Sequence, residues 1–75
     1  MLEQIKNIIV NYVEVDTNTI TEDSEFIADL GFSSYDFMSF LSEIEDEFDV
    51  EIDEREVVKI LTVGQAIEYI KSLQA

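Results

Sequence analysis

The sequence contains no cysteine, no histidine and no proline, and the first two absences exclude several kinds of site. Without cysteine, the chain can form neither disulfides nor thiolate zinc sites. Without histidine, the Ser-His-Asp and Cys-His arrangements of nucleophilic catalysis are also excluded. Carboxylates alone could support glycosidase-like acid–base chemistry, but a chain of 75 residues shows no sign of a substrate cleft, so we do not expect an enzyme.

Basic residues are scarce as well: 4 Lys and Arg stand against 18 Asp and Glu, for a net charge of −14. A charge of this sign argues against binding to nucleic acid and to anionic membrane surfaces. It favours partner proteins that carry patches of Lys and Arg. High net charge is also typical of disordered chains, but 47% of the residues are hydrophobic and clearly periodic, which predicts a folded protein.

The excess of acidic residues predicts self-repulsion in the folded chain. We therefore expect salt or divalent cations to raise the thermal midpoint of unfolding. A magnesium titration followed by thermal denaturation tests this, and an unchanged midpoint would contradict it.

Long apolar runs are also missing, since no run approaches the about 20 residues that a membrane-spanning helix needs. The first residues, Met1-Leu2-Glu3-Gln4, lack the basic and apolar regions of a signal peptide. These observations predict a cytoplasmic protein without membrane insertion. A single domain of residues 1–75 and a monomeric state are our default expectations.

The apolar periodicity predicts an all-α fold: a small four-helix bundle with three main helices, one short helix and a long loop after the first helix. The first helix is expected from Leu2 to about Val15. Residues 16–32 form the long loop, and the family resemblance described below implies a helical turn near residues 24–28. The loop is expected to be pinned over the core by spaced apolar residues: Ile20, Phe26, Ile27 and Leu30.

The second helix is the best defined. Leu30-Gly31 predicts a turn, Ser33 stands at the N-cap position with Asp36 three residues on, and Ser34 is the first helical residue. A core stripe follows at helical spacing up to the end of the helix: Phe37, Phe40, Leu41, Ile44 and Phe48. Beside it lies a half-apolar stripe outside the core arc: Tyr35, Met38 and Ser42.

Two further capping boxes predict the remaining helices. Asp53 with Glu56 predicts a short helix over about 54–59, and Thr62 with Gln65 predicts a helix over about 63–73. The short helix is expected to contribute Val57, Val58, Ile60 and Leu61 to the core, and the last helix Ala66, Ile67, Ile70 and Leu73. Gly64 in the first turn of the last helix is expected to weaken it by roughly 1 kcal/mol.

Three segments of the chain resemble the acyl carrier protein family. Residues 29–36, D-L-G-F-S-S-Y-D, resemble its signature D-L-G-x-D-S-L-D. Residues 45–52 resemble its acidic segment E-E-E-F-x-x-E-I, and residues 59–66 resemble its segment K-I-x-T-V-x-x-A. The similarity covers essentially the whole chain, with the segments in the right order.

The resemblance implies that Ser34 carries 4′-phosphopantetheine through a phosphodiester. A helix N-terminus suits that charge, because its free N–H groups and partial positive charge favour anions. No group of the chain could activate Ser34, so a phosphopantetheinyl transferase that uses coenzyme A and magnesium would supply the base and the metal. The thiol of the arm then holds an acyl group as a thioester, and other enzymes perform the chemistry.

Two positions depart from the family pattern: Ser33 replaces the usual Asp, and Tyr35 replaces the usual Leu. A serine caps a helix about as well as an aspartate, so the departures bear on recognition rather than on the fold. They favour a specialised polyketide-like or lipid route over fatty-acid synthesis, although both stay open. Two alternatives also stay open: an aminoacyl or peptidyl carrier with the same arm, and an unmodified acidic interaction module in which Ser34 only helps the helix start.

The acidic stretch of residues 43–56 allows three interpretations: a solvated face, a metal site or a docking surface. An EF-hand register from Asp49 fails, because Glu54 replaces the required Gly and Ile60 replaces the final Glu. We expect no specific metal site, although weak divalent binding stays open. We favour docking of basic partner enzymes on this side of the second helix, at Tyr35, Asp36, Met38, Ser42 and Glu45.

The resemblance also implies that the acyl chain can lie between the second helix and its neighbours. The residues expected to line that space are Phe37, Phe40, Leu41, Ile44 and Ile60. The bulky rings of Phe37 and Phe40 would narrow it. Our hypothesis is therefore a short or specialised cargo.

Overall fold

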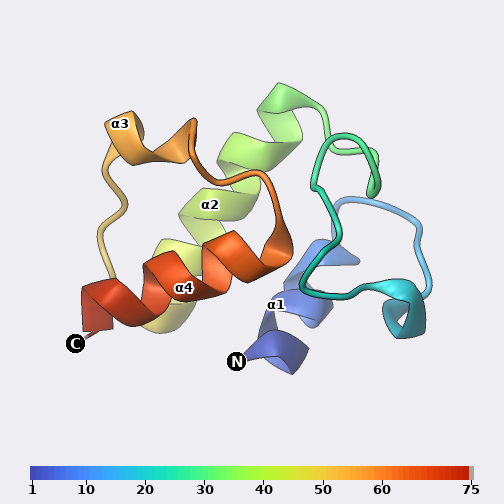
Figure 1. The fold of residues 1–75 in the computed structure, drawn as a ribbon, viewed down its shortest axis with the longest axis horizontal. Helices are drawn as coiled ribbons and strands as arrows, with labels where there is room; N and C mark the ends of the chain where they lie inside the picture. The colour runs from blue at the N-terminus through green and yellow to red at the C-terminus, as the bar shows by residue number, and fades with distance from the viewer. Residues whose placement is uncertain (75) are drawn as a thin grey trace.

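Four α-helices and a long first loop make up the fold in the computed structural model, which describes residues 1–74. The helices are α1 (Leu2–Ile9), α2 (Ser34–Phe48), α3 (Glu54–Val57) and α4 (Val63–Gln74), and the loop contains a short 3-10 helix, η1 (Thr17–Thr19). The long loop and α3 lie on opposite sides of α2 and α4 (Figure 1). The predicted all-α, four-helix architecture is confirmed.

The bounds predicted for α2 are confirmed. Gly31 has φ +81°, a left-handed conformation that favours glycine, and it turns the chain into the helix. The Ser33 hydroxyl then accepts a hydrogen bond from the Asp36 amide at 3.1 Å, which caps the N-terminus. At the other end, Asp49 adopts a left-handed conformation with φ 53° and ends the helix.

The first helix is shorter than predicted, since α1 ends at Ile9 instead of about Val15. Beyond it the chain tightens into 3-10-type turns: the Asn11 amide donates to the Ile8 carbonyl and the Tyr12 amide donates to the Ile9 carbonyl, both at 3.0 Å. Tyr12 and Val13 still pack against the core. The apolar spacing therefore continues to side chains that pack against the core, but the prediction that the backbone stays α-helical to about Val15 is wrong.

Tyr12 fastens this end of α1 to α2. Its hydroxyl donates a hydrogen bond to the Glu43 carboxylate at 2.5 Å. That bond, together with burial, raises the pKa of the Tyr12 hydroxyl to about 12. The contact is therefore fully present at neutral pH and is lost only as the pH rises toward that value.

The third helix is a single turn, and its predicted capping box is wrong in detail. The Asp53 carboxylate accepts from the Arg55 amide at 2.9 Å and not from the Glu56 amide, while Glu56 forms an ion pair with Lys59 at 3.2 Å. Val58 and Leu61, expected in the core, are exposed. The box predicted for α4 is confirmed in both directions, because Thr62 and Gln65 each accept a hydrogen bond from the other's amide.

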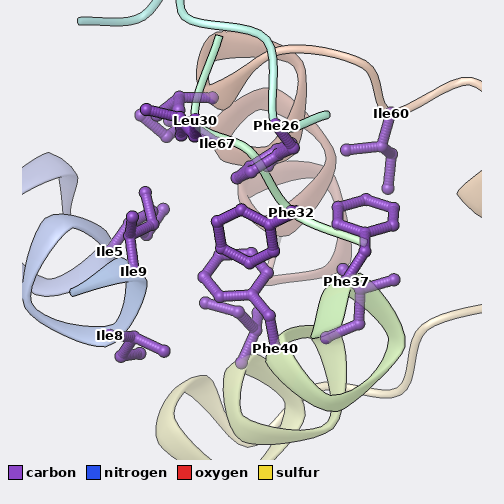
Figure 2. Close-up of a cluster of buried hydrophobic side chains, with 14 of the residues drawn as sticks. Ile5, Ile8, Ile9, Phe26, Leu30, Phe32, Phe37, Phe40, Ile60 and Ile67 are labelled. Atoms are coloured by element: carbon purple, nitrogen blue, oxygen red, sulfur yellow. The ribbon is translucent and has the colours of Figure 1, made fainter. Parts of the chain in front are cut away.

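Phenylalanine rings occupy the centre of the core (Figure 2). The rings of Phe26, Phe32, Phe37 and Phe40 all contact one another, with centroids 5.1–6.5 Å apart. The isoleucines of α1 flank this cluster on one side and Ile60 on another. Phe32 was not predicted as a core residue, because it lies in the turn before α2. Besides Val58 and Leu61, two more predicted core residues lie outside: Ile27 of the loop and Leu73 of α4 are exposed.

A seam of backbone hydrogen bonds joins the long loop to the start of α4. The Phe26 amide donates to the Leu61 carbonyl at 3.0 Å, and the Val63 amide donates to the Ser24 carbonyl at 2.9 Å. Gly64 extends the seam, since its amide donates to the Glu22 carbonyl at 2.8 Å. A Cβ atom at position 64 would lie only 3.0 Å from that oxygen. Gly64 therefore favours the close approach of two backbones, a role that the predicted weakening of α4 did not include.

Candidate functional site

Ser34 is exposed and is the first residue of α2. The first hydrogen bond of the helix runs from the Phe37 amide to the Ser33 carbonyl at 2.9 Å, and the Ser33 hydroxyl takes up the Asp36 amide. The amides of Ser34 and Tyr35 precede that first bond, and they point out of the helix end. The N-terminus of α2 therefore presents N–H groups and its partial positive charge next to the Ser34 hydroxyl.

An apolar pocket of about 450 Å³ opens beside this serine. We call it the outer pocket. Ser34 itself belongs to its lining, together with Phe37 and Met38 of α2. The rest of the lining comes from loop residues 25–28 and from Val57, Val58, Ile60 and Leu61, in and after α3. The exposed Ser34 hydroxyl thus lies at the edge of a mostly apolar space.

A second space, the inner gap, lies between α2 and α4 and has no room for a water molecule. Its lining is Phe40, Leu41, Ile44, Ile52, Ile60, Ala66, Tyr69 and Ile70. The five residues predicted to line one acyl pocket are therefore divided. Phe37 lines the outer pocket, Phe40, Leu41 and Ile44 line the inner gap, and Ile60 lines both.

Comparison with known proteins agrees with this geometry. The sequence model of a family described as "phosphopantetheine attachment site" matches residues 3–70. An acyl carrier protein of Lactobacillus acidophilus is 45% identical over 74 residues, which cover 99% of this chain and 92% of that protein. The chain belongs to the acyl carrier protein family.

A solved structure leads to the same family. The chain resembles the acyl carrier protein from Enterococcus faecalis with a TM-score of 0.83 and 36% identity, over 96% of this chain and 91% of that one. The predicted resemblance and the predicted role as a carrier are confirmed at this level. The prosthetic group of this family is a covalently attached 4′-phosphopantetheine.

The residues of this acyl carrier protein fit such a group. A phosphodiester at Ser34 would stand at the N-terminus of a 15-residue helix, where the amides of Ser34 and Tyr35 favour an anion. The apolar lining of the outer pocket would face the less polar parts of the arm or its cargo. The Ser33 hydroxyl accepts the capping hydrogen bond, so the two adjacent serines differ in their contacts.

The residues predicted for docking partner enzymes lie along α2, but they differ in exposure. Tyr35, Met38 and Ser42 are exposed, while Asp36 and Glu45 are half-buried. The Ser42 hydroxyl donates to the Met38 carbonyl one turn earlier, at 3.3 Å. The off-core position predicted for the Tyr35 and Met38 stripe is therefore present in the acyl carrier fold.

Glu45 has an internal contact that the sequence did not indicate. Its carboxylate accepts a hydrogen bond from the Ile52 amide at 2.8 Å. This bond ties the link between α2 and α3 back onto α2. Beyond it, the Tyr69 hydroxyl accepts from the Asp53 amide at 3.1 Å and ties the same link to α4. Glu45 thus helps to hold the segment that leads to the outer pocket.

We expect Glu45→Ala to lower the free energy of unfolding by roughly 1.5–3 kcal/mol, the range for a hydrogen bond to a charged group. Glu45→Gln should lose less, because an amide oxygen can still accept from the Ile52 amide. Urea denaturation measures both. Glu47→Ala is the matched control, since it removes the same charge from an exposed position of α2. Equal effects of the two alanine variants would rule out the hydrogen bond as the cause.

Sequence analysis missed the pocket role of the second residue in each of three adjacent apolar pairs: Phe26-Ile27, Val57-Val58 and Ile60-Leu61. In each pair the first residue is buried or half-buried, and the second is exposed and lines the outer pocket. Sequence analysis assigned both members to the core. Which member of each pair faces inward follows from the tertiary packing of the loop and of the segment around α3, so sequence spacing alone did not separate them.

The acidic residues do not converge on a metal. Within residues 1–74, no three carboxylates lie close enough together to hold a metal ion. None of the helices in the same range has the length and apolar character that would let it span a bilayer.

Proposed function

We propose that this protein carries acyl groups as thioesters on a 4′-phosphopantetheine arm attached to Ser34. The observation that carries the proposal is the position of Ser34. The residue is exposed, it begins α2, and it lines an apolar pocket of about 450 Å³. The charged end of the arm is suited to the helix N-terminus, and an apolar cargo is suited to the pocket.

The partners follow from charge. A net charge of −14 favours association with enzymes that present basic docking patches. We expect these partners to be a phosphopantetheinyl transferase and the enzymes that load and transfer the acyl group. On this protein the docking surface would be the exposed stripe of Tyr35, Met38 and Ser42 with the acidic Asp36, while Glu45 contributes through the fold as well as through its charge. We further propose that the protein acts as a monomer in the cytoplasm.

The intact mass after incubation with coenzyme A, magnesium and a broad-specificity phosphopantetheinyl transferase tests the attachment. We expect a gain of one phosphopantetheine, and peptide mapping should locate it on Ser34. No gain with this enzyme, for the natural chain and for Ser33→Asp alike, would contradict the proposal and favour an unmodified interaction module. A gain only for Ser33→Asp would mean that this transferase needs the carboxylate, and attachment at Ser34 would stand.

Loading of the modified protein identifies the cargo class. The apolar lining of the pocket supports an acyl group, whether for fatty-acid synthesis or for a specialised polyketide-like or lipid route. We expect acyl-activating enzymes to load the arm more readily than amino-acid-adenylating enzymes. Preferential loading of an amino acid would favour an aminoacyl or peptidyl carrier.

A further inference from the structure

The sulfur chemistry of this protein rests on two methionines, Met1 and Met38, since the chain has no cysteine. The two differ in their surroundings. Met1 is partly buried and packs against the hydrophobic core, whereas Met38 is 46% exposed on α2. A thioether is oxidised to a sulfoxide where an oxidant can reach the sulfur. Met38 is therefore the more open of the two to oxidation.

The position of Met38 gives its oxidation a consequence. Ser34 precedes it by four residues on α2, so the two side chains are neighbours on the same face of the helix. Met38 also lines two hollows. One is the outer pocket, and the other is a smaller cleft of about 200 Å³ between α2 and the segment of α3. A change in the polarity of this one side chain therefore alters both hollows and the surroundings of Ser34.

A sulfoxide oxygen at this position would find few hydrogen-bond donors. Of the described residues that line the outer pocket, only Ser34 has a hydroxyl or N–H group in its side chain. The polar side chains of the smaller cleft are Ser42, Glu45 and Glu54. The Ser42 hydroxyl already donates to the Met38 carbonyl, and ionised carboxylates can only accept. The sulfoxide oxygen therefore either accepts from the Ser34 hydroxyl or leaves a polar group on an apolar surface.

We propose that Met38 is a site of reversible oxidation by peroxides, and that its sulfoxide slows attachment of the arm to Ser34. The sulfur lone pair attacks one oxygen of hydrogen peroxide, the O–O bond breaks, and the leaving hydroxide takes the remaining proton to form water. The sulfur loses two electrons and the peroxide gains them. A methionine sulfoxide reductase reverses the change. The oxidation is independent of the proposed function, whereas its effect on attachment rests on it.

Graded treatment of the unmodified protein with hydrogen peroxide tests the site. Intact mass counts the oxygen atoms gained, and peptide mapping locates them. We expect the first oxygen on Met38, with little change in the thermal midpoint of unfolding, because the side chain is exposed. Oxidation of Met1 first, or of both methionines at the same rate, would overturn the proposal. Unfolding of the singly oxidised protein would also overturn it, because the effect would then not be local.

The singly oxidised protein, freed of peroxide, is then incubated with coenzyme A, magnesium and the transferase. We expect kcat/KM for attachment to fall about tenfold, which corresponds to about 1.4 kcal/mol, and treatment with the reductase to restore it. An unchanged kcat/KM would overturn the proposed effect. If the untreated chain also fails to gain the arm, the proposed function fails, and peptide mapping still decides whether Met38 is the oxidation site.

Two variants of the same position separate polarity from other damage by peroxide. Met38→Leu keeps an apolar side chain of similar volume without sulfur, so peroxide should not change its own rate of attachment. Met38→Gln places a polar group there without any oxidant, and we expect attachment to be slow from the start. A slower rate in peroxide-treated Met38→Leu, or equal rates in untreated Met38→Gln and Met38→Leu, would contradict the proposal.

Discussion

Replacing Ser34 by alanine is expected to abolish attachment of 4′-phosphopantetheine completely and to leave the bundle folded. The attachment needs a hydroxyl at this position, and alanine removes only that oxygen. Alanine is also a good helix former, and the capping of α2 depends on the hydroxyl of Ser33, not of Ser34. Intact mass after treatment with transferase and coenzyme A measures the attachment, and circular dichroism checks the fold.

Ser33→Ala is the matched control. It removes the cap that accepts from the Asp36 amide, so we expect it to lower the free energy of unfolding by about 1 kcal/mol while the arm is still attached. The adjacent serines thus separate two roles. If the arm were still attached to Ser34→Ala, or if only Ser33→Ala lost it, the attachment site would not be Ser34 and the proposed site would be refuted.

Phe40→Ala is expected to cost about 3–5 kcal/mol of stability, the range for deleting a buried phenylalanine. The Phe40 side chain is fully buried, and its ring contacts those of Phe26, Phe32 and Phe37. At about 0.05–0.15 kcal/mol per residue, a chain of 75 residues has only about 4–11 kcal/mol in total. The variant should therefore be largely destabilised, with a much lower urea midpoint.

Tyr35→Ala provides the comparison on the same helix. Tyr35 is 80% exposed, and we expect a change within about 0.5 kcal/mol. If Phe40→Ala were as mild as Tyr35→Ala in urea denaturation, the ring cluster would not be the stabilising centre of the fold. Tyr35→Ala should instead affect association with partner enzymes.

The helix ends with strong local signals were predictable from the sequence. Ser33 before α2 and the Thr62 and Gln65 pair before α4 act through contacts within a few residues, so the sequence contains the whole interaction. The end of α1 was not predictable, because Tyr12 and Val13 continue the apolar spacing although the backbone has left the α-helix. Their packing is settled by tertiary contacts, such as the bond from Tyr12 to Glu43.

The candidate site shows the same division. The place of Ser34 at the start of α2 was predictable from its neighbours, whereas the pocket beside it was not. The pocket is formed by loop residues 25–28 and by the chain around Val58 and Leu61, which are distant in sequence. Glu45 is a similar case, since an acidic residue that holds a backbone amide has the same local pattern as one that faces solvent.

The segment that carries α3 is fixed at both ends and free of buried residues within the helix itself. At one end the Ile52 amide is held by Glu45, and at the other the Leu61 carbonyl is held by the Phe26 amide. The segment is therefore held to the rest of the molecule by a hydrogen bond at each end. Because both of these contacts lie outside α3, the helix itself adds no buried side chain that would hold the segment to the core.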